Sequence, residues 1–149
     1  MVSQTVLLDS GPLGLLTNPN VSESATQCVK WLQKVATSGT TVIVPEIADY
    51  EIRRELLRAR KTEGIRRLDN LISQTDYLAI TTTAIRQAAE YWAEARQQGR
   101  ATADDKALDG DVILAAQAAT LDRTNVVIAT TNVKHLSRFT QAMLWSDIG

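Results

Sequence analysis

The stretch "TVLLDSGPL" (residues 5–13) decides the fold. Its apolar run, Val6 to Leu8, is typical of a strand buried on both faces, and such strands occur in parallel sheets covered by helices. The run ends in a carboxylate, Asp9, followed by a hydroxyl and a glycine. A single aspartate after a strand is often a turn residue that accepts a hydrogen bond from its own backbone. Its significance therefore depends on whether other carboxylates reach the same place.

Strands and helices alternate along the rest of the chain. Three more apolar runs predict strands, and a fourth is a candidate for a short last strand: 41–44, 77–80, 125–130 and 142–145. Apolar residues at helical spacing predict helices over 25–36, 46–61, 62–74, 81–99 and 111–123. Ser22 or Ser24 is expected to cap the first of them. This order favours the α/β class, with a parallel sheet of four to five strands covered on both faces, and we expect residues 1–149 to form a single domain.

Single residues set three expected boundaries. Pro45 suits the first turn of the second helix, where its missing N–H costs nothing. Gly64, or a kink near it, separates the helices on either side. The polar stretch 100–110 predicts a loop, so Asp111 is expected to open the helix that follows.

The composition narrows the class of protein. A hydrophobic fraction of 44% and a charged fraction of 22% are ordinary for a globular protein. The formal net charge of -1 gives no overall basic field, so any attraction for nucleic-acid phosphates must be local. Cys28 is the only cysteine, which excludes an internal disulfide and argues against a thiolate zinc site. With no basic leader before an apolar core and no apolar run of membrane-spanning length, we expect a soluble cytoplasmic protein and no membrane partner.

Three more side chains with oxygen ligands fall near one edge of the predicted sheet. Glu51 lies near the start of the helix after the second strand, Asp111 opens an apolar helix, and Asn132 follows the fourth strand. In open parallel sheets, functional groups gather beyond the carboxyl ends of the strands. Each residue also has an ordinary structural explanation. Asp111 and Asn132 would cap helices, and Glu51 would belong to a solvated helix face.

Considered together, these residues favour a metal site. Carboxylates pressed together repel unless a cation lies between them. Sites built from oxygen ligands suit Mg²⁺ or Mn²⁺ rather than Zn²⁺. His135 is the only histidine, so neither a histidine-ligated zinc site nor a Ser–His–Asp triad is well supported. The sequence therefore indicates a magnesium or manganese site that includes Asp9.

The chain resembles the PIN domain family, and specifically its small VapC-like toxin ribonucleases. Four patterns carry the resemblance, and their order and spacing are fairly specific: "VLLDSGPL", "VPEIADYEIRREL", "DGDVILAAQA" and "IATTNVKHLSRF". The resemblance covers nearly the whole chain. It implies a three-layer α/β/α sandwich with a central parallel sheet. It also implies a divalent-metal-dependent endoribonuclease, the toxin of a type II toxin–antitoxin pair.

The same resemblance implies a role for each residue of the site. Asp9 and Asp111 would be the main ligands of Mg²⁺ or Mn²⁺. Glu51 would bind the metal directly or through water and help to activate the attacking water. Asn132 would occupy the fourth position of the site. The residues expected to orient the carboxylates are Ser10 and either Thr130 or Thr131. The implied partners are RNA, a cognate antitoxin and a second copy of the chain.

Two residues differ from the family's usual pattern. Asn132 is neutral at a position that holds Asp or Asn across the family, so the site carries three formal negative charges. His135 stands where many relatives carry another acid, and it is either a phosphate contact or an ordinary surface residue. Asp109 competes with Asp111 for the ligand position, although only Asp111 has the family's spacing to "ILAA".

The segment 53–67 is the best local candidate for contacts with RNA phosphates. It holds seven basic residues against two acidic ones, and five of the basic residues are RNA-binding candidates: Arg53, Arg54, Arg58, Arg60 and Lys61. The alternative is a solvated helix face that pairs with an acidic partner. Aromatic residues make up only 5% of the chain, so no base-stacking platform is evident. Trp31 and Trp92 lie at helical spacing and are expected in the core or in a dimer contact.

Two other classes of function remain open. One is a catalytically weak or inactive module of the same fold that binds RNA or protein, and such a module need not bind a divalent metal. The other is phosphotransfer chemistry with Asp9 as the nucleophile. The sequence lacks the second aspartate, two residues later, that is expected of aspartate-nucleophile phosphatases.

Overall fold

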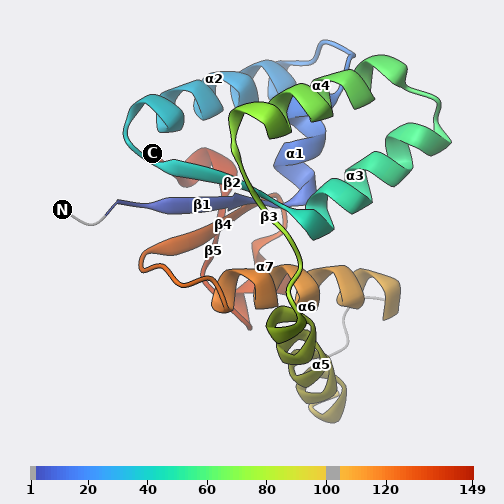
Figure 1. Cartoon of the computed structure of the whole chain (residues 1–149), viewed down its shortest axis with the longest axis vertical. Coiled ribbons are helices and arrows are strands. Elements are labelled where there is room, and N and C mark those ends of the chain that lie inside the picture. The colour runs from blue at the N-terminus through green and yellow to red at the C-terminus, as the bar shows by residue number, and fades with distance from the viewer. Residues whose placement is uncertain (1–2, 100–104) are drawn as a thin grey trace.

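The computed structural model describes residues 3–99 and 105–149 (Figure 1). Within these residues, a five-stranded sheet has the order β3-β2-β1-β4-β5, and every neighbouring pair is parallel. The strands are β1 (Thr5–Leu8), β2 (Thr41–Pro45), β3 (Asp76–Leu78), β4 (Val126–Thr130) and β5 (Ala142–Leu144). The prediction of an α/β fold with a parallel sheet of four to five strands is confirmed.

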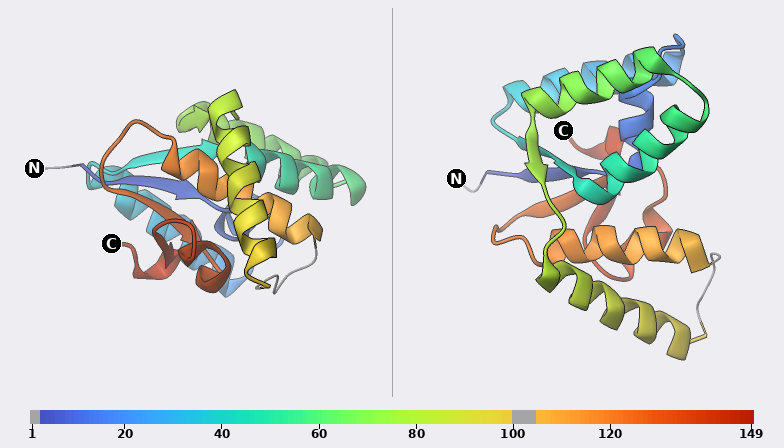
Figure 2. Two further views of the ribbon diagram at one scale, coloured as in Figure 1. Left: turned by 90° about the horizontal axis from the view of Figure 1, so that it is seen from below. Right: turned by 45° about the vertical axis from the view of Figure 1, so that its right-hand side comes forward.

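Helices cover both faces of the sheet (Figures 1 and 2). Side chains alternate along a strand, so Val6 and Leu8 of β1 pack in one core and Leu7 packs in the other. All three side chains are fully buried. The apolar run near the start of the sequence is therefore the central strand of the sheet, which explains why it shows no polar alternation.

The first core lies under the helices α1 (Ser10–Thr17), α2 (Glu23–Thr37), α3 (Glu46–Arg58) and α4 (Thr62–Gln74). The opposite face is covered by α6 (Asp105–Ala119) and α7 (Val133–Ser137). The remaining helix, α5 (Thr82–Gln97), packs against α6 through a separate apolar cluster. Ser22 caps α2, as expected, by accepting a hydrogen bond from the backbone N–H of Ala25 at 3.1 Å.

One expected boundary is wrong, and at a second the structure supports the alternative of a break near Gly64 rather than at it. Pro45 is the last residue of β2 and precedes α3, because it pairs with Leu78 of β3 in an extended conformation. The chain leaves α3 at Arg60, whose φ of 56° lies in the left-handed region and cannot continue a helix. Gly64 is therefore inside α4, where it packs against Leu56 of α3.

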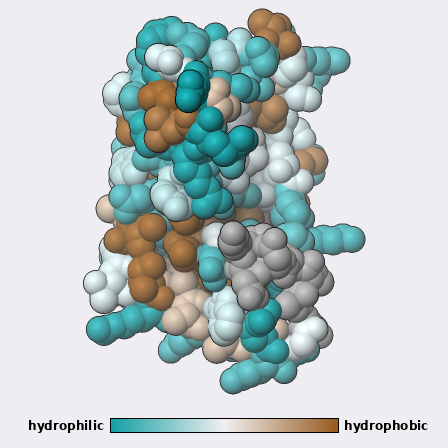
Figure 3. Space-filling view, turned by 90° about the vertical axis from the view of Figure 1, so that its right-hand side faces the viewer, coloured by the Kyte–Doolittle hydropathy of each residue, from teal (hydrophilic) through white to brown (hydrophobic). Residues whose placement is uncertain are grey.

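All neighbouring strands are parallel, so their carboxyl ends lie along one edge of the sheet. In Figure 1 the central strands β1 and β2 run towards the right. Figure 3 faces this side, where hydrophilic surface separates two hydrophobic patches. Asp9, Pro45 and Asn132 each follow or end a strand at this edge. In the described part of the chain, no helix has the length and apolar character needed to cross a membrane.

Candidate functional site

Asp9 directly follows β1 and caps α1. Its backbone N–H donates to the carbonyl of Ala129 in β4 at 2.9 Å. Its Oδ1 accepts a hydrogen bond from the Ser10 N–H at 2.7 Å, and the Ser10 hydroxyl lies 3.4 Å from the same oxygen. Its Oδ2 accepts one from the Thr130 hydroxyl at 2.7 Å. The ends of two neighbouring strands therefore fix the position of this carboxylate.

Thr130, which is fully buried, links Asp9 to the segment that leads into α7. Its hydroxyl oxygen accepts a hydrogen bond from the backbone N–H of Asn132 at 3.0 Å. Thr131 is exposed and lies against Gly11, where an added Cβ would come within 2.8 Å of its Cγ2. Of the two threonines that the sequence leaves as candidates, Thr130 is the one with a hydrogen bond to Asp9.

Glu51 lies in the second turn of α3 and reaches the surface of α6. Its side chain is only 24% exposed, and Nη2 of Arg54 lies 4.0 Å from its Oε2. The same oxygen packs so closely on Gly110 that a Cβ at residue 110 would lie 2.7 Å away. The absence of a side chain at Gly110 therefore makes room for the Glu51 carboxylate.

Asp111 lies in the interior of α6, and the expectation that it opens the helix is wrong. The helix begins at Asp105, inside the stretch 100–110 that the sequence predicts as a loop; residues 100–104 lie outside the described residues. An interior residue cannot cap a helix N-terminus, so this ordinary explanation for the carboxylate is removed. Its Oδ2 is buried with no hydrogen-bond partner among the described residues. The nearest cationic candidate, Nδ1 of His135, is 3.4 Å away, too far for a good hydrogen bond.

Asp9 influences the protonation of both other carboxylates. Burial, followed by the negative charge of Asp9, raises the pKa of Asp111 from 3.8 to about 6, and His135 acts in the opposite direction. Burial also raises the pKa of Glu51, with Asp9 adding to the rise and Arg54 opposing it. Three carboxylates carried by different elements thus share one electrostatic environment at the carboxyl edge of the sheet.

The chemistry of these carboxylates fits a hard divalent cation, although they do not form a ready-made cluster of ligands. Within residues 3–99 and 105–149, no three acidic, histidine or cysteine side chains lie close enough together to hold a metal ion. A bound cation would nevertheless offset the shared negative charge and bind Asp111 Oδ2, which has no hydrogen-bond partner among the described residues. Mg²⁺ prefers oxygen ligands and keeps several of its waters, so a few carboxylates are enough to bind it.

Asn132 and His135 lie on the α7 side of this site. Nδ2 of Asn132 is 3.2 Å from Nδ1 of His135, and the Asn132 side chain does not cap α7. The competing aspartate, Asp109, is exposed and lines an apolar groove between α5 and α6 together with Trp92. Trp31, in contrast, is a core residue, 7% exposed.

Several members of the basic segment 53–67 are engaged in ion pairs. Arg53 binds Asp49 at 3.0 Å and Asp69 at 2.8 Å, and thereby ties α3 to α4. Arg58 pairs with Glu55 within α3. These arginines hold the two helices together or pair within one of them, so their charges are partly neutralised inside the chain.

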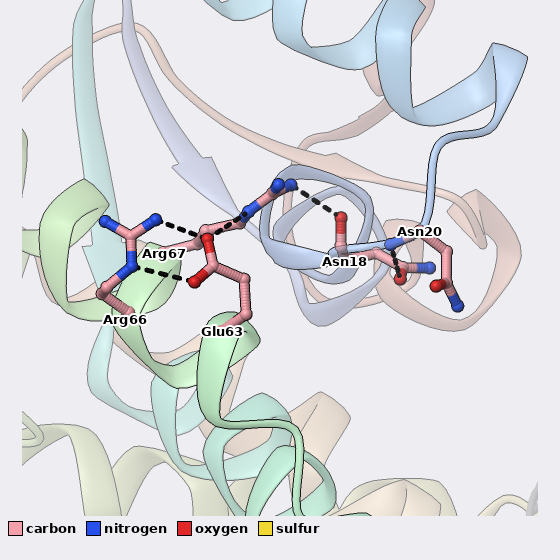
Figure 4. A network of polar contacts seen from close by, with 5 residues as sticks. All are labelled: Asn18, Asn20, Glu63, Arg66 and Arg67. Atoms are coloured by element: carbon pink, nitrogen blue, oxygen red, sulfur yellow. Dashed lines mark hydrogen bonds and ion pairs between the residues drawn. The ribbon is translucent and has the colours of Figure 1, made fainter.

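Figure 4 shows the pairs that Glu63 makes in this segment. Glu63 binds both Arg66 and Arg67, and Arg67 also donates to the carbonyl of Asn18 at 3.0 Å, which joins α4 to the end of α1. With the described residues, Arg60 and Lys61 form no ion pair. The cations with weak or no pairing are therefore Arg54, Arg60 and Lys61.

Two residues that help to position the site were missed at the level of sequence. One is Gly110, under Glu51. The other is Gln117, which is 1% exposed. The Gln117 side chain accepts a hydrogen bond from the backbone N–H of Ile47 at 3.4 Å and donates to the carbonyl of Leu78 at 2.9 Å. It joins α6 to the first turn of α3, the helix that carries Glu51. A glutamine inside the apolar stretch "ILAAQAA" was the available signal, because a buried amide needs partners.

Comparison with known proteins bears on the fold. Neither the family models nor the curated proteins include a match to this sequence. Solved structures match over nearly the whole chain. A chain of VapBC2 from Rickettsia felis, solved with a DNA fragment from its promoter, has a TM-score of 0.70 and 17% identity, and the match covers 94% of this chain and 98% of that one.

Two further structures agree with this match. VapBC-1 from nontypeable Haemophilus influenzae has a TM-score of 0.67 and 18% identity, with 97% of this chain and 100% of that chain covered. DNA-bound VapBC from Salmonella typhimurium has a TM-score of 0.64 and 17% identity, with 97% and 99% covered. The chain therefore has a PIN-like fold, and the resemblance seen in the sequence is confirmed for the fold.

Proposed function

We propose that this chain is a divalent-metal-dependent endoribonuclease, the toxin of a type II toxin–antitoxin pair. The observation that carries the proposal is the gathering of three carboxylates at the carboxyl edge of the sheet. Thr130 fixes Asp9 there, and Glu51 packs over Gly110, next to Asp111. The pKa values of Glu51 and Asp111 are raised in part by the charge of Asp9. The likeness to chains of three VapBC complexes supports it at the level of fold. By the same argument, a cognate antitoxin and a second copy of the chain are proposed as partners, and the cytoplasm as the place of action.

In the proposed reaction, Asp9 and Asp111 would hold Mg²⁺ or Mn²⁺, and Glu51 would bind it directly or through water. When bound, the ion neutralises charge on the phosphate and makes a bound water more acidic. Glu51 is the carboxylate that would accept the proton of the attacking water. Attack in line forms the new P–O bond as the P–O3′ bond breaks, and the leaving 3′-oxygen takes up a proton from solvent, so the product carries a 5′-phosphate. Ser10 and Thr130 keep Asp9 oriented throughout.

The substrate is proposed to run over the cations that are not committed to ion pairs. Arg54, Arg60 and Lys61 lie on α3 or in the turn that follows it, and positive charge supplies most of the sequence-independent affinity for RNA. Arg53 and Arg58, which the sequence also suggests, are less suited, because they must first leave their carboxylate partners.

One observation favours a second candidate function. The carboxylates are not close enough together, as they stand, to form a metal cluster within the described residues. A PIN-like module that binds RNA or protein with weak or no catalysis would have no need of such a cluster. Metal binding measured by calorimetry separates the two candidates.

The proposed nuclease is tested with purified protein and a mixture of single-stranded and structured RNAs. Cleavage is measured with Mg²⁺, with Mn²⁺ and with EDTA, for the wild type, for Asp9→Asn and for Asp76→Asn. Asp76 is an exposed aspartate at the opposite end of the sheet, where β3 begins, and so serves as a matched control. We expect metal-dependent cleavage that only Asp9→Asn abolishes. A lack of both cleavage and metal binding in the wild type would rule out the nuclease in favour of the binding module.

A further inference from the structure

We propose that Tyr50 and Arg54 form a subsite for one unpaired nucleotide of the RNA substrate, beside Glu51. In this subsite a base stacks on the Tyr50 ring, and Arg54 contacts the neighbouring phosphate. The inference rests on the proposed nuclease function and adds where, and by which chemistry, the chain holds the RNA next to the cleaved bond.

No contact within the described residues explains why the Tyr50 ring is exposed to solvent. Its side chain is 57% exposed, the largest value among the aromatic side chains of the described residues. A tyrosine ring is normally buried against apolar neighbours, with only its hydroxyl near water. Tyr77, the other exposed tyrosine, is 39% exposed. Its hydroxyl donates a hydrogen bond to Asp49 at 2.8 Å, and this bond explains why the ring lies at the surface. No comparable hydrogen bond holds the Tyr50 hydroxyl to the described residues.

Arg54 joins the Tyr50 ring to the carboxylates. Its guanidinium carbon lies 5.1 Å from the centroid of the ring, one helical turn away on α3. Its Nη2 lies 4.0 Å from Glu51 Oε2, a separation at which the ion pair is weak. The Arg54 side chain remains 53% exposed. One cation therefore lies between an exposed aromatic ring and a proposed catalytic carboxylate.

This arrangement suits single-stranded RNA. Unpaired bases stack on aromatic side chains whatever their sequence, because every base has a π-face. Arg54 is held over the Tyr50 ring by cation–π attraction, which keeps its guanidinium beside the stacking surface. A guanidinium also binds a phosphate through two parallel hydrogen bonds. Arg54 lies over the Tyr50 ring, and its Nη2 is 4.0 Å from Glu51 Oε2. A base stacked on this ring therefore belongs to a nucleotide close to the scissile phosphate.

A protein partner is the competing occupant of this surface. Exposed tyrosine and arginine are also common at the centre of protein interfaces. Leu57, 61% exposed, lies two turns further along α3, and it would belong to the same contact. The proximity of Arg54 to Glu51 favours RNA, because a phosphate at the carboxylates needs a nearby positive charge. Leu57→Ala therefore provides a matched control that separates the two occupants.

The test measures binding of fluorescein-labelled single-stranded RNA by anisotropy in EDTA, with Asp9→Asn protein to prevent cleavage. In this background we expect Tyr50→Ala to weaken binding about tenfold, since stacking on one aromatic ring is worth that much or more. Tyr50→Phe, which keeps the ring, and Leu57→Ala should bind as the parent does. A series of RNAs, each with one abasic nucleotide at a different position, should include one position at which the affinity falls. This loss of affinity should be absent in Tyr50→Ala, which has no ring for the base to stack on.

Other outcomes would overturn the subsite. They are wild-type affinity in Tyr50→Ala, an equal loss in Tyr50→Phe, an abasic effect that persists in Tyr50→Ala, or no RNA binding at all. A loss shared with Leu57→Ala, together with a change in molecular mass by light scattering, would assign the surface to a protein. Metal-dependent cleavage by the wild type with unchanged RNA binding in Tyr50→Ala would remove the subsite and leave the proposed nuclease intact.

Discussion

The Thr130 hydroxyl donates a hydrogen bond to Asp9 Oδ2 at 2.7 Å and thereby joins the ends of β4 and β1. Asp9 Oδ1 is held separately by the Ser10 N–H, so both oxygens of the carboxylate have a fixed direction. The hydroxyl oxygen of Thr130 also accepts from the Asn132 N–H. One buried side chain thus connects two residues of the proposed site across neighbouring strands.

Thr130→Val removes this connection while keeping the shape of the side chain. We expect the free energy of unfolding to fall by about 1–3 kcal/mol, because buried polar groups lose their partner, and Mn²⁺ binding to weaken. Urea unfolding and calorimetry measure the two effects. Thr131→Val, at an exposed position, should change stability by less than about 0.5 kcal/mol. Equal losses of stability in the two variants would contradict a special role for Thr130.

Asp111 makes the stability of the protein depend on pH. Its pKa is about 6 in the folded protein against an ordinary value of 3.8, so the folded state holds the proton more tightly than the unfolded chain does. The free energy of unfolding therefore falls as the pH rises through this window. We expect Asp111→Asn to match the wild type near pH 4 and to be more stable at pH 7.5, by about 1–3 kcal/mol. Urea unfolding in EDTA tests this. If Asp111→Asn is less stable than the wild type at pH 7.5, the ionised Asp111 carboxylate does not destabilise the folded protein.

A divalent cation should stabilise the wild-type protein. An ion that binds only the folded state adds about 2.7 kcal/mol at a concentration of 100 times its Kd. Mn²⁺ should therefore raise Tm, relative to EDTA, in the wild type and in Asp109→Asn, and should no longer do so in Asp111→Asn. Thermal unfolding of these proteins decides between the two aspartates that the sequence leaves in competition. The opposite pattern would make Asp109 the ligand.

The sheet was easier to predict than the helices that carry the site. Most of the strands contain an apolar run short enough to be recognised alone, whereas β3 begins at the exposed Asp76, one residue before the predicted run. Parallel strands bring Asp9 and Asn132 to the same edge without further information. The start of α6 was missed because residues 105–110 show no helical spacing of apolar residues, although the helix includes them. The position of Asp111 inside α6 follows from that start.

Local sequence patterns could not predict the contacts between helices and strands. Gln117 reads as one polar residue in an apolar helix, and its bonds to α3 and β3 appear only when α6 is placed on the sheet. The stack of Arg54 on Tyr50 has a helical spacing that the sequence contains, but the exposure of the ring depends on how α3 packs. Burial and partners, rather than residue types, were the missing information.

Gly110 leads to a prediction in which stability and metal binding change in opposite directions. Alanine is more favourable than glycine inside a helix by about 1 kcal/mol, so Gly110→Ala should leave stability unchanged or raise it. An added Cβ would nevertheless lie 2.7 Å from Glu51 Oε2. Because this oxygen ends a flexible side chain, the carboxylate would turn aside. We expect weaker Mn²⁺ binding by calorimetry and slower RNA cleavage in a protein that is folded normally.

A double-mutant cycle shows whether the effect of Gly110→Ala passes through Glu51. If it does, adding Gly110→Ala to Glu51→Gln causes no further loss of Mn²⁺ affinity, since the displaced carboxylate is already gone. Gly14→Ala is the matched control, because Gly14 also lies inside a helix and its nearest neighbour is Ile52 Cδ1, at 3.3 Å from an added Cβ. That control should bind Mn²⁺ as the wild type does. Two results would contradict this prediction: losses of Mn²⁺ affinity that add in the double mutant, or an unchanged affinity in Gly110→Ala. Either would mean that metal binding by Glu51 does not depend on its packing over Gly110.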